Sequence, residues 1–403
     1  MHDEGNMELH TGNRSIAEPR KGDEVEETQG LPSDHRGLGV IIAGGGTGGH
    51  LFPGIAIAEE FLRRNPAHRI LFIGTERGLE KKILGGLGLP LRTIHVEGIK
   101  GRSPLRTAGA LVKIPGGLIA SFRILRKFHP DIVVGVGGYA SGPAVLAACL
   151  MRVKTAIAEQ NAFPGLTNRI LGYFADRIFL TFPVSQRWFP KRRTLVTGNP
   201  IRAAFLAEKP QEEKKDPCFT ILVFGGSQGA HTINRMVSEA VDGLQHLKDR
   251  LRFIHQAGEK DLETMTATYR ERGFAAEVSP FIMDMAAAYH KADLLLCRAG
   301  ATSIAEITAG GKASILIPFP LAVNDHQTQN AEVLSRTGAA EVIAEKDLSG
   351  PGLARVIERF YQNPGAVRKM EAAAAALGKR RAAKDIVDIC LTLVRDRRPT
   401  GYI

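Results

Sequence analysis

The chain has 403 residues, of which 44% are hydrophobic and only 6% aromatic, and 44 are glycine. This length exceeds what one hydrophobic core usually organises, so we expect two domains, and the composition favours an α/β fold over an all-β sandwich. The net charge of +11 suits a nucleic acid, an anionic membrane or a polyanionic substrate and does not distinguish among them.

Residues 1–36 are polar and acid-rich and contain no apolar core of a signal peptide, which predicts a disordered extension. No apolar run reaches the roughly 18 to 20 residues that span a bilayer. The cysteines are far apart and show no metal-ligand spacing, so we expect reduced core residues and no metal site. They are Cys149, Cys218, Cys297 and Cys390. The sequence predicts a cytoplasmic protein, peripheral to a membrane at most.

Short β-branched runs alternate with helical patterns, which is typical of parallel sheets with right-handed crossovers. Strands are expected at 38–43, 69–73, 91–95, 131–135, 154–158 and 176–180, then at 219–224, 251–255, 276–279, 292–296, 313–317 and 339–343. This pattern predicts two doubly wound parallel-sheet domains. We place them at 37–199 and 200–381, with a hinge at Thr197–Pro200 and a linker at 208–217. A helix from Ala382 to about Arg397, within a tail at 382–403, could pack back on the first domain, although periodicity does not determine this.

Each predicted domain opens with a glycine-rich turn, IIAGGGTGGHLFPG at 41–54 and ILVFGGSQGAHTIN at 221–234. Glycines at a strand-to-helix turn let the backbone approach a ligand, and the helix N-terminus favours phosphate. Thr47 and Ser227 can add hydroxyl donors. The first turn also matches the dinucleotide pattern G-x-G-x-x-G, so a nicotinamide dehydrogenase remains an alternative. The match is loose, because Glu76, the candidate to bind the ribose, lies about 30 residues after the turn instead of about 20, and the second turn lacks the pattern.

Four further polar loops follow predicted strands, at Gly137–Pro143, Glu159–Asn161, Arg298–Glu306 and Asn324–Asn330. In open α/β sheets ligands bind at the carboxyl ends of the strands, so these loops predict a cleft between the domains. Each loop taken alone is also compatible with ordinary helix capping.

Much of the positive charge lies between Lys81 and Lys127, with ten Lys or Arg against one acid, Glu97. Apolar residues are interspersed: Ile83, Leu84, Leu111, Ile114, Leu118, Ile119, Phe122 and Leu125. The stretch could bind an anionic membrane, or could form helices with a core face and a solvated basic face. Nucleic-acid binding is disfavoured because RNP, KH and basic-helix patterns are absent.

Several of these motifs together resemble the MurG-type N-acetylglucosaminyltransferases of glycosyltransferase family 28. They are GGTGGHLFPGIAIAE, GGYASGP, EQN, GGSQGAHTIN, the stretch from Phe281 to Pro320, and DHQTQNA. The resemblance runs from about Gly37 to near the C-terminus. It implies a GT-B fold, two Rossmann-like domains facing a cleft, and inverting transfer of N-acetylglucosamine from its UDP derivative to undecaprenyl-diphospho-N-acetylmuramoyl-pentapeptide on the cytoplasmic face of the plasma membrane. A non-catalytic nucleotide- or membrane-binding module is the remaining alternative.

The resemblance also implies a donor site, mostly on the second domain. Ser227 and Arg202 would hold the diphosphate, the Ile282 backbone would pair with uracil, Glu306 would receive the ribose hydroxyls, and Gln327 would hold the sugar. The other donor residues would be Thr47, Gly48, Gly49, Asn161, Ala301, Thr302, Ser303, Ile304 and Ala305. Where the family usually has histidine before EQN, this chain has Ala158, so that side chain has no counterpart here.

Displacement of UDP requires stabilisation of the diphosphate, which backbone N–H groups, helix ends and Arg202 can supply without a metal. It also requires a base for the acceptor hydroxyl. His50 is the first candidate because its pKa lies near the working range, and Glu159 is the second; either residue could instead be structural. Gly138, Tyr139 and Ser141 would shape the acceptor site. We expect the first turn to face the diphosphate of the lipid acceptor.

Overall fold

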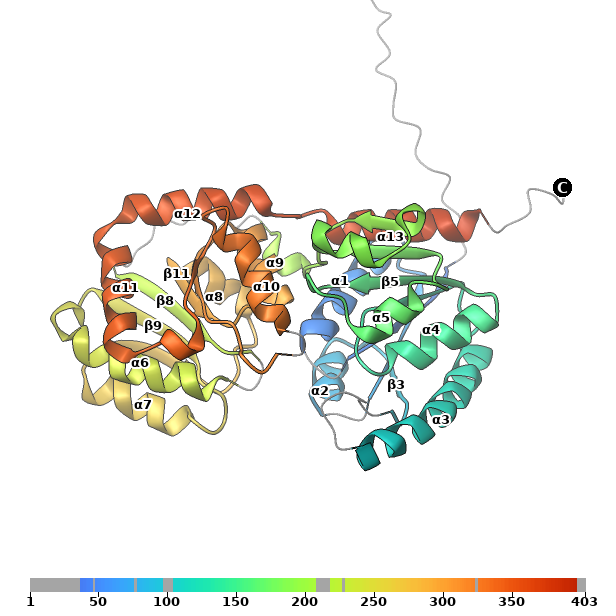
Figure 1. The fold of residues 1–403 in the computed structure, drawn as a ribbon, viewed down its shortest axis with the longest axis horizontal. Coiled ribbons are helices and arrows are strands. Elements are labelled where there is room, and N and C mark those ends of the chain that lie inside the picture. Colours follow the sequence, from blue (N-terminus) through green and yellow to red (C-terminus); the bar gives the residue numbers. More distant parts are fainter. Residues whose placement is uncertain are drawn as a thin grey trace, which may run out of the picture. The chain divides into compact units, whose positions relative to one another are not determined.

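The computed structural model describes residues 37–45, 48–75, 78–96, 104–207, 218–226, 229–322 and 325–396. The predicted extension at 1–36 and the predicted linker at 208–217 lie outside these residues. Two parallel sheets, each flanked by helices, organise the described chain, as predicted (Figure 1).

The first sheet has seven strands in the order β3-β2-β1-β4-β5-β6-β7, all parallel. Its strands are β1 (Gly39–Ala43), β2 (Arg69–Gly74), β3 (Leu91–Thr93), β4 (Ile132–Gly135), β5 (Lys154–Glu159), β6 (Arg177–Leu180) and β7 (Thr194–Val196). Its helices are α1 (Gly48–Arg64), α2 (Gly78–Gly86), α3 (Pro104–Phe128), α4 (Ser141–Leu150) and α5 (Leu166–Leu171).

The second sheet has six parallel strands in the order β10-β9-β8-β11-β12-β13. Its strands are β8 (Phe219–Phe224), β9 (Leu251–Gln256), β10 (Ala275–Ser279), β11 (Leu294–Cys297), β12 (Ala313–Leu316) and β13 (Glu341–Val342). The helices are α6 (His231–Gly243), α7 (Leu262–Glu271), α8 (Met285–Lys291), α9 (Ala301–Gly310), α10 (His326–Ser335), α11 (Gly350–Gln362), α12 (Pro364–Leu377) and α13 (Ala382–Arg395). Short 3-10 helices occupy Pro183–Trp188, Lys191–Arg193, Ala203–Phe205, Gln245–Leu247 and Glu345–Asp347.

Both faces of each sheet are covered, which explains why the central strands are continuous apolar runs. In β1, Val40 and Ile42 face a core shared with α1, α2 and α13, whereas Ile41 and Ala43 face a core shared with α3, α4 and α5. The second sheet repeats this alternation: Ile221 and Val223 of β8 face α6, α7 and α11, and Leu222 and Phe224 face α8 and α9.

The C-terminal helix α13 packs on the first sheet, against α1 (Figure 1). Ile386, Val387 and Cys390 are each 0% exposed and belong to the core that contains β1. An ion pair of Arg64 with Asp388, 2.5 Å apart, lies beside this contact. Helix α13 therefore returns the chain to the first domain, which periodicity alone could not determine.

The strand predictions are confirmed with small shifts of their ends, and one strand was missed. The edge strand β7 has three residues with the pattern TLV, of which only the first is buried, so it carries no long apolar run. The last predicted strand, 339–343, is reduced to two residues, and the last helix ends at Arg395. Of the four cysteines, all free, Cys297 and Cys390 are buried as expected, whereas Cys149 and Cys218 are only partly buried.

The basic stretch divides between α2, α3 and the segments around them. Leu84 and Leu125 are buried, and Leu118 and Phe122 pack against the core, so much of the apolar pattern is a core face. Ile119 differs, because it is 51% exposed on α3. The side chains of Leu111 and Ile114 lie outside the described residues.

Candidate active site

Strands β1 and β4 are neighbours from which the chain departs in opposite directions, so their carboxyl ends form the switch point at which α/β sheets bind ligands. The loops that follow them pack tightly on each other. Gly138 has φ +79°, and a Cβ on it would lie 2.2 Å from the Gly45 carbonyl oxygen. Only glycine fits this contact, which brings the predicted acceptor loop against the first glycine-rich turn.

His50 lies in the first turn of α1, at the centre of this edge. Its Nδ1 is 3.2 Å from Oε1 of Gln160, which follows β5. Burial lowers the pKa of His50, and hydrogen bonds to Gln160 and to the Val136 carbonyl oppose this effect. The ring is therefore mainly neutral near pH 7, which is the form required of a base.

Glu159, the second candidate base, is 3% exposed. Its carboxylate accepts hydrogen bonds from the backbone N–H groups of Asn161, at 2.9 Å, and Gly165, at 3.0 Å. The side chains of Asn161 and Asn168 donate two more, at 3.3 and 2.9 Å. Burial raises its pKa, and these bonds lower it. The carboxylate thus holds the 161–165 loop in place, and its catalytic role stays a prediction.

The acceptor residues differ in exposure. Tyr139 is 43% exposed, whereas Ser141 is 0% exposed at the start of α4 and its Oγ has no hydrogen-bond partner among the described residues. A Cβ on Gly135 would lie 2.5 Å from this Oγ, so the hydroxyl points toward β4. Tyr139 thus has the exposed side chain of this group, which can contact a ligand without rearrangement.

On the second sheet, β8 and β11 form the equivalent switch point. Ser227, like Thr47 of the first turn, lies outside the described residues. The neighbouring Gly226 carbonyl accepts a 2.6 Å hydrogen bond from Nε2 of Gln256, whose Oε1 accepts the Ile282 N–H at 2.9 Å. One buried side chain therefore ties the glycine-rich turn to the loop predicted to hold uracil, and the Ile282 amide is already engaged.

Helix α9 carries the segment Ala301–Glu306 and begins at the N-cap Gly300. Thr302 donates from Oγ1 to the Gly49 carbonyl at 3.0 Å, so this helix end meets the first turn of α1. Further along, Glu306 is buried and lies 3.6 Å from Arg202. Burial raises the pKa of Glu306 to about 7, and Arg202 opposes the shift.

Arg202 also reaches the first domain. Its guanidinium lies 4.2 Å from the centre of the Phe52 ring, on α1. Its Nε is buried without a hydrogen-bond partner among the described residues. Gln327 instead bonds within its own region, where its Oε1 accepts the Phe319 N–H at 3.0 Å.

Three residues that the sequence analysis did not select organise this region: Gln160, Gln256 and Asn330. Asn330 of α10 is 0% exposed. Its Oδ1 accepts the Ala162 N–H at 3.0 Å, and its Nδ2 lies 3.3 Å from Asn161 Oδ1 and 3.4 Å from the Ala299 carbonyl. Gln160 and Asn330 stood inside the EQN and DHQTQNA motifs, and an amide at a strand end was the signal that could have marked Gln160 and Gln256.

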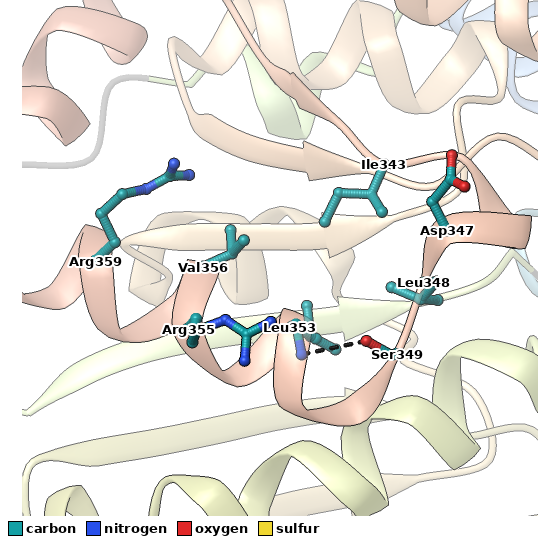
Figure 2. A pocket seen from close by; sticks show the side chains of 9 residues that line it. Ile343, Asp347, Leu348, Ser349, Leu353, Arg355, Val356 and Arg359 are labelled. Atoms are coloured by element: carbon teal, nitrogen blue, oxygen red, sulfur yellow. Dashed lines mark hydrogen bonds between the residues drawn. The ribbon is translucent and has the colours of Figure 1, made fainter.

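A separate cavity of about 420 Å³ lies at the start of α11 and contains none of the predicted site residues. Figure 2 shows its apolar floor with two arginines beside it. The lining residues are Ile343, Asp347, Leu348, Ser349, Gly352, Leu353, Arg355, Val356 and Arg359. Across the described residues there is no cluster of three or more His, Cys, Asp or Glu placed to hold a metal ion, and none of the helices described is long and apolar enough to cross a membrane.

Comparison with known proteins gives matches to both halves of the chain. The profile of the glycosyltransferase family 28 N-terminal domain matches residues 40–180, and that of the family 28 C-terminal domain matches residues 220–386. These ranges contain the first and second sheets, respectively, apart from β7 and the first residue of each sheet.

Similar relatives carry one name, UDP-N-acetylglucosamine--N-acetylmuramyl-(pentapeptide) pyrophosphoryl-undecaprenol N-acetylglucosamine transferase. The protein of Syntrophus aciditrophicus is 61% identical over 356 residues, covering 88% of this chain and 99% of that protein. That of Geobacter metallireducens is 50% identical over 362 residues, covering 89% and 100%. Among solved structures, Acinetobacter baumannii MurG matches with a TM-score of 0.69 and 31% identity, covering 88% of this chain and 99% of that one. A UDP-GlcNAc 2-epimerase from Neisseria meningitidis, at TM-score 0.64 and 14% identity over 88% and 100%, shares the fold alone.

Proposed function

Since the chain belongs to glycosyltransferase family 28 and has a GT-B fold, we infer that it transfers N-acetylglucosamine from UDP-N-acetylglucosamine to the N-acetylmuramoyl-pentapeptide carried on undecaprenyl diphosphate. The observation that carries this inference is the high identity to a transferase of that name along nearly its whole length. The geometry agrees, because both glycine-rich turns stand at the switch points of their sheets. The reaction is a step in peptidoglycan synthesis.

The reaction that we propose is a single displacement. The acceptor hydroxyl oxygen bonds to the anomeric carbon, the bond from that carbon to the diphosphate breaks, and UDP leaves with the bonding electrons. His50 takes the hydroxyl proton, which its neutral state permits. Attack opposite the leaving group inverts the anomeric centre.

For the donor we propose the second sheet. The turn with Ser227, the start of α9 and Arg202 would stabilise the departing diphosphate without a metal, because helix N-termini and a guanidinium supply positive charge. Thr302 at this helix end touches Gly49, which would bring Thr47, Gly48 and Asn161 within reach of the donor. Glu306 would accept the ribose hydroxyls after exchanging its contact with Arg202.

For the acceptor we propose the first sheet, with the turn before α1 and the loop at Gly138 and Tyr139. A lipid-linked acceptor requires membrane association, so we place the enzyme peripherally on the cytoplasmic face of the plasma membrane. Exposed apolar side chains support an attachment surface: Ile119 of α3 is 51% exposed, and Tyr173 and Phe174, just after α5, are 72% and 55% exposed. Basic residues of α3 lie beside Ile119, including Arg123 and Lys127.

A UDP-release assay with the lipid-linked muramoyl-pentapeptide as acceptor tests the transferase. We expect release that depends on the acceptor and is lost about 100-fold or more in His50→Gln, because general-base catalysis contributes about 10² to 10⁴. The matched control is His246→Gln, which we expect to be fully active. His246 is exposed and lies in the short helix Gln245–Leu247, before β9. No UDP release by the wild type with a competent acceptor would refute the transferase.

Two binding measurements separate the alternatives. UDP and UDP-N-acetylglucosamine should raise the melting temperature of the protein, and NADH should not; stabilisation by NADH alone would indicate a dehydrogenase. Sedimentation with anionic vesicles should exceed that with neutral vesicles and weaken with salt. Tyr173→Ser with Phe174→Ser should reduce it, and equal, salt-insensitive binding to both vesicle types would contradict the electrostatic part of the attachment.

A further inference from the structure

The side chain of Gln160 lies in a fixed orientation beneath His50. It is 2% exposed, and its Nε2 donates a 3.1 Å hydrogen bond to the Val136 carbonyl. Rotating the amide by half a turn would place its carbonyl oxygen against the Val136 oxygen, which is unfavourable because neither atom carries a proton. The bond to Val136 therefore defines which end of the amide faces the imidazole.

The end that faces His50 is Oε1, which can only accept a hydrogen bond. It lies 3.2 Å from His50 Nδ1, so this nitrogen must carry the proton. The Val136 carbonyl is a second acceptor close to the same ring. Gly137 completes the seat: it has φ +89°, and a Cβ on it would lie 2.6 Å from Nδ1, so only glycine lets the ring approach both acceptors.

A neutral imidazole protonated on Nδ1 has its lone pair on Nε2. His50 bonds to Gln160 through Nδ1, so the lone pair on Nε2 is the one that can face a substrate. The charge of His326, on α10, acts on His50 and disfavours the protonated form. Gln160 and Val136 act in the opposite direction.

We propose that Gln160 is a positioning residue for the transferase reaction: it holds His50 as the Nδ1–H tautomer, so that Nε2 is the atom that takes the proton from the acceptor hydroxyl. This assignment rests on the proposed function for its catalytic part. The tautomer itself is a property of the free protein.

The experiment compares the full-length wild type with Gln160→Met and Gln160→Glu. Met keeps the volume and removes both amide contacts, whereas Glu keeps an acceptor oxygen beside Nδ1 and loses the bond to Val136. The exposed Gln245, whose side chain donates to the Arg272 carbonyl, provides the matched control Gln245→Met. Nitrogen NMR of ¹⁵N-histidine-labelled protein reads the tautomer, and the signal lost in His50→Gln assigns His50.

We expect a pyrrole-like Nδ1 and a pyridine-like Nε2 for His50 in the wild type and the control, and a mixture of tautomers in Gln160→Met. The kcat of Gln160→Met should fall at least about tenfold, since a wrong histidine tautomer can cost up to about 10⁴, with the KM for UDP-N-acetylglucosamine within about twofold of wild type. Gln160→Glu should keep the Nδ1 proton, recover part of kcat, and move the acidic limb of the pH profile upward, because a carboxylate favours the imidazolium.

A wild-type Nε2–H tautomer would overturn the proposal, as would an undisturbed tautomer or an unchanged kcat in Gln160→Met. A merely structural role predicts equal losses in both variants and no shift of the pH limb, which would also overturn it. Failure of the proposed function is distinguishable, since it appears as absence of UDP release by the wild type while the NMR signals still report the tautomer.

Discussion

Asn330 offers a direct test of the hydrogen bonds that join α10 to the loop after β5. Replacing it with Leu keeps a similar volume and removes all three contacts of its buried amide. The Ala162 N–H, in a residue 2% exposed, then has no acceptor. An orphaned buried donor costs about 1 to 3 kcal/mol. The two longer bonds, at 3.3 and 3.4 Å, should add less, so we expect a total loss of about 2 to 4 kcal/mol.

Asn330→Asp should be worse at neutral pH than Asn330→Leu. It keeps the acceptor for Ala162 but turns a second acceptor toward the Asn161 and Ala299 oxygens and buries an unpaired charge. The deficit of the Asp variant should shrink at low pH, where protonation restores a donor. This ordering separates a hydrogen-bond effect from a packing effect, which would spare the nearly isosteric Asp.

Urea unfolding measures these losses. The single tryptophan, Trp188, reports on the first sheet's side of the contact by its fluorescence. Glu332→Gln is the control on the same helix, because its exposed pair with Arg336 should contribute less than about 0.5 kcal/mol. If Asn330→Leu were no less stable than this control, the reasoning from buried hydrogen bonds would be refuted.

Three further predictions concern buried groups. Burial lowers the pKa of His255 to about 3, so this side chain stays neutral in the fold, whereas the unfolded chain binds a proton below about pH 6.5. The folding constant should therefore fall by up to about tenfold for each pH unit between 6.5 and 3. Urea unfolding of the wild type and His255→Gln across this pH range measures the contribution of His255. Glu306 acts oppositely, because its pKa is raised to about 7 and the fold therefore retains its proton between about pH 4.5 and 7, so that its contribution to stability weakens as pH rises. In Glu306→Gln the rise of stability with pH over that window should therefore be steeper than in the wild type. The same variant should bind UDP more weakly in a titration. Gly198→Ala should destabilise by at least about 1 to 2 kcal/mol in thermal unfolding, since Gly198 has φ +88° and a Cβ would lie 2.4 Å from Lys379 Cβ; an unchanged melting temperature would show that the turn relaxes freely.

The strands could be predicted from the sequence where consecutive residues are apolar because they are buried on both faces of the sheet. Strands such as β1 and β8 are sandwiched between helices and are therefore apolar at almost every position, which sets them apart from the helices around them. The edge strand β7 has no such run, and its pairing with β6 depends on the neighbour instead of its own residues. The docking of α13 on α1 was likewise undetermined, because an apolar helical face does not specify its partner.

For the site, the sequence located the loops but not the contacts among their side chains. The sequence ranked His50 before Glu159 as the base only on the usual pKa of its residue type. The fold separates them: the carboxylate of Glu159 is committed to four hydrogen bonds within its loop, whereas the His50 ring bonds through Nδ1 to Gln160. The partners that matter are distant along the chain: Gln160 is 24 positions from Val136, and Asn330 is 168 positions from Ala162. Periodicity and motif spacing carry no information at that range.

The position of His50 in the first turn of α1 makes its pKa respond to the acceptor. In the free protein the helix N-terminus and burial both disfavour the imidazolium. The same N-terminus is the site that we propose for the acceptor's diphosphate, and an anion bound there would neutralise the helix end and favour the imidazolium. The base would then gain proton affinity when its substrate is in place. The acidic limb of kcat, which reports the complex, should therefore lie about one pH unit above that of kcat/KM, which reports the free enzyme. Coincident limbs would place the diphosphate away from α1 and refute the proposed acceptor site at this turn.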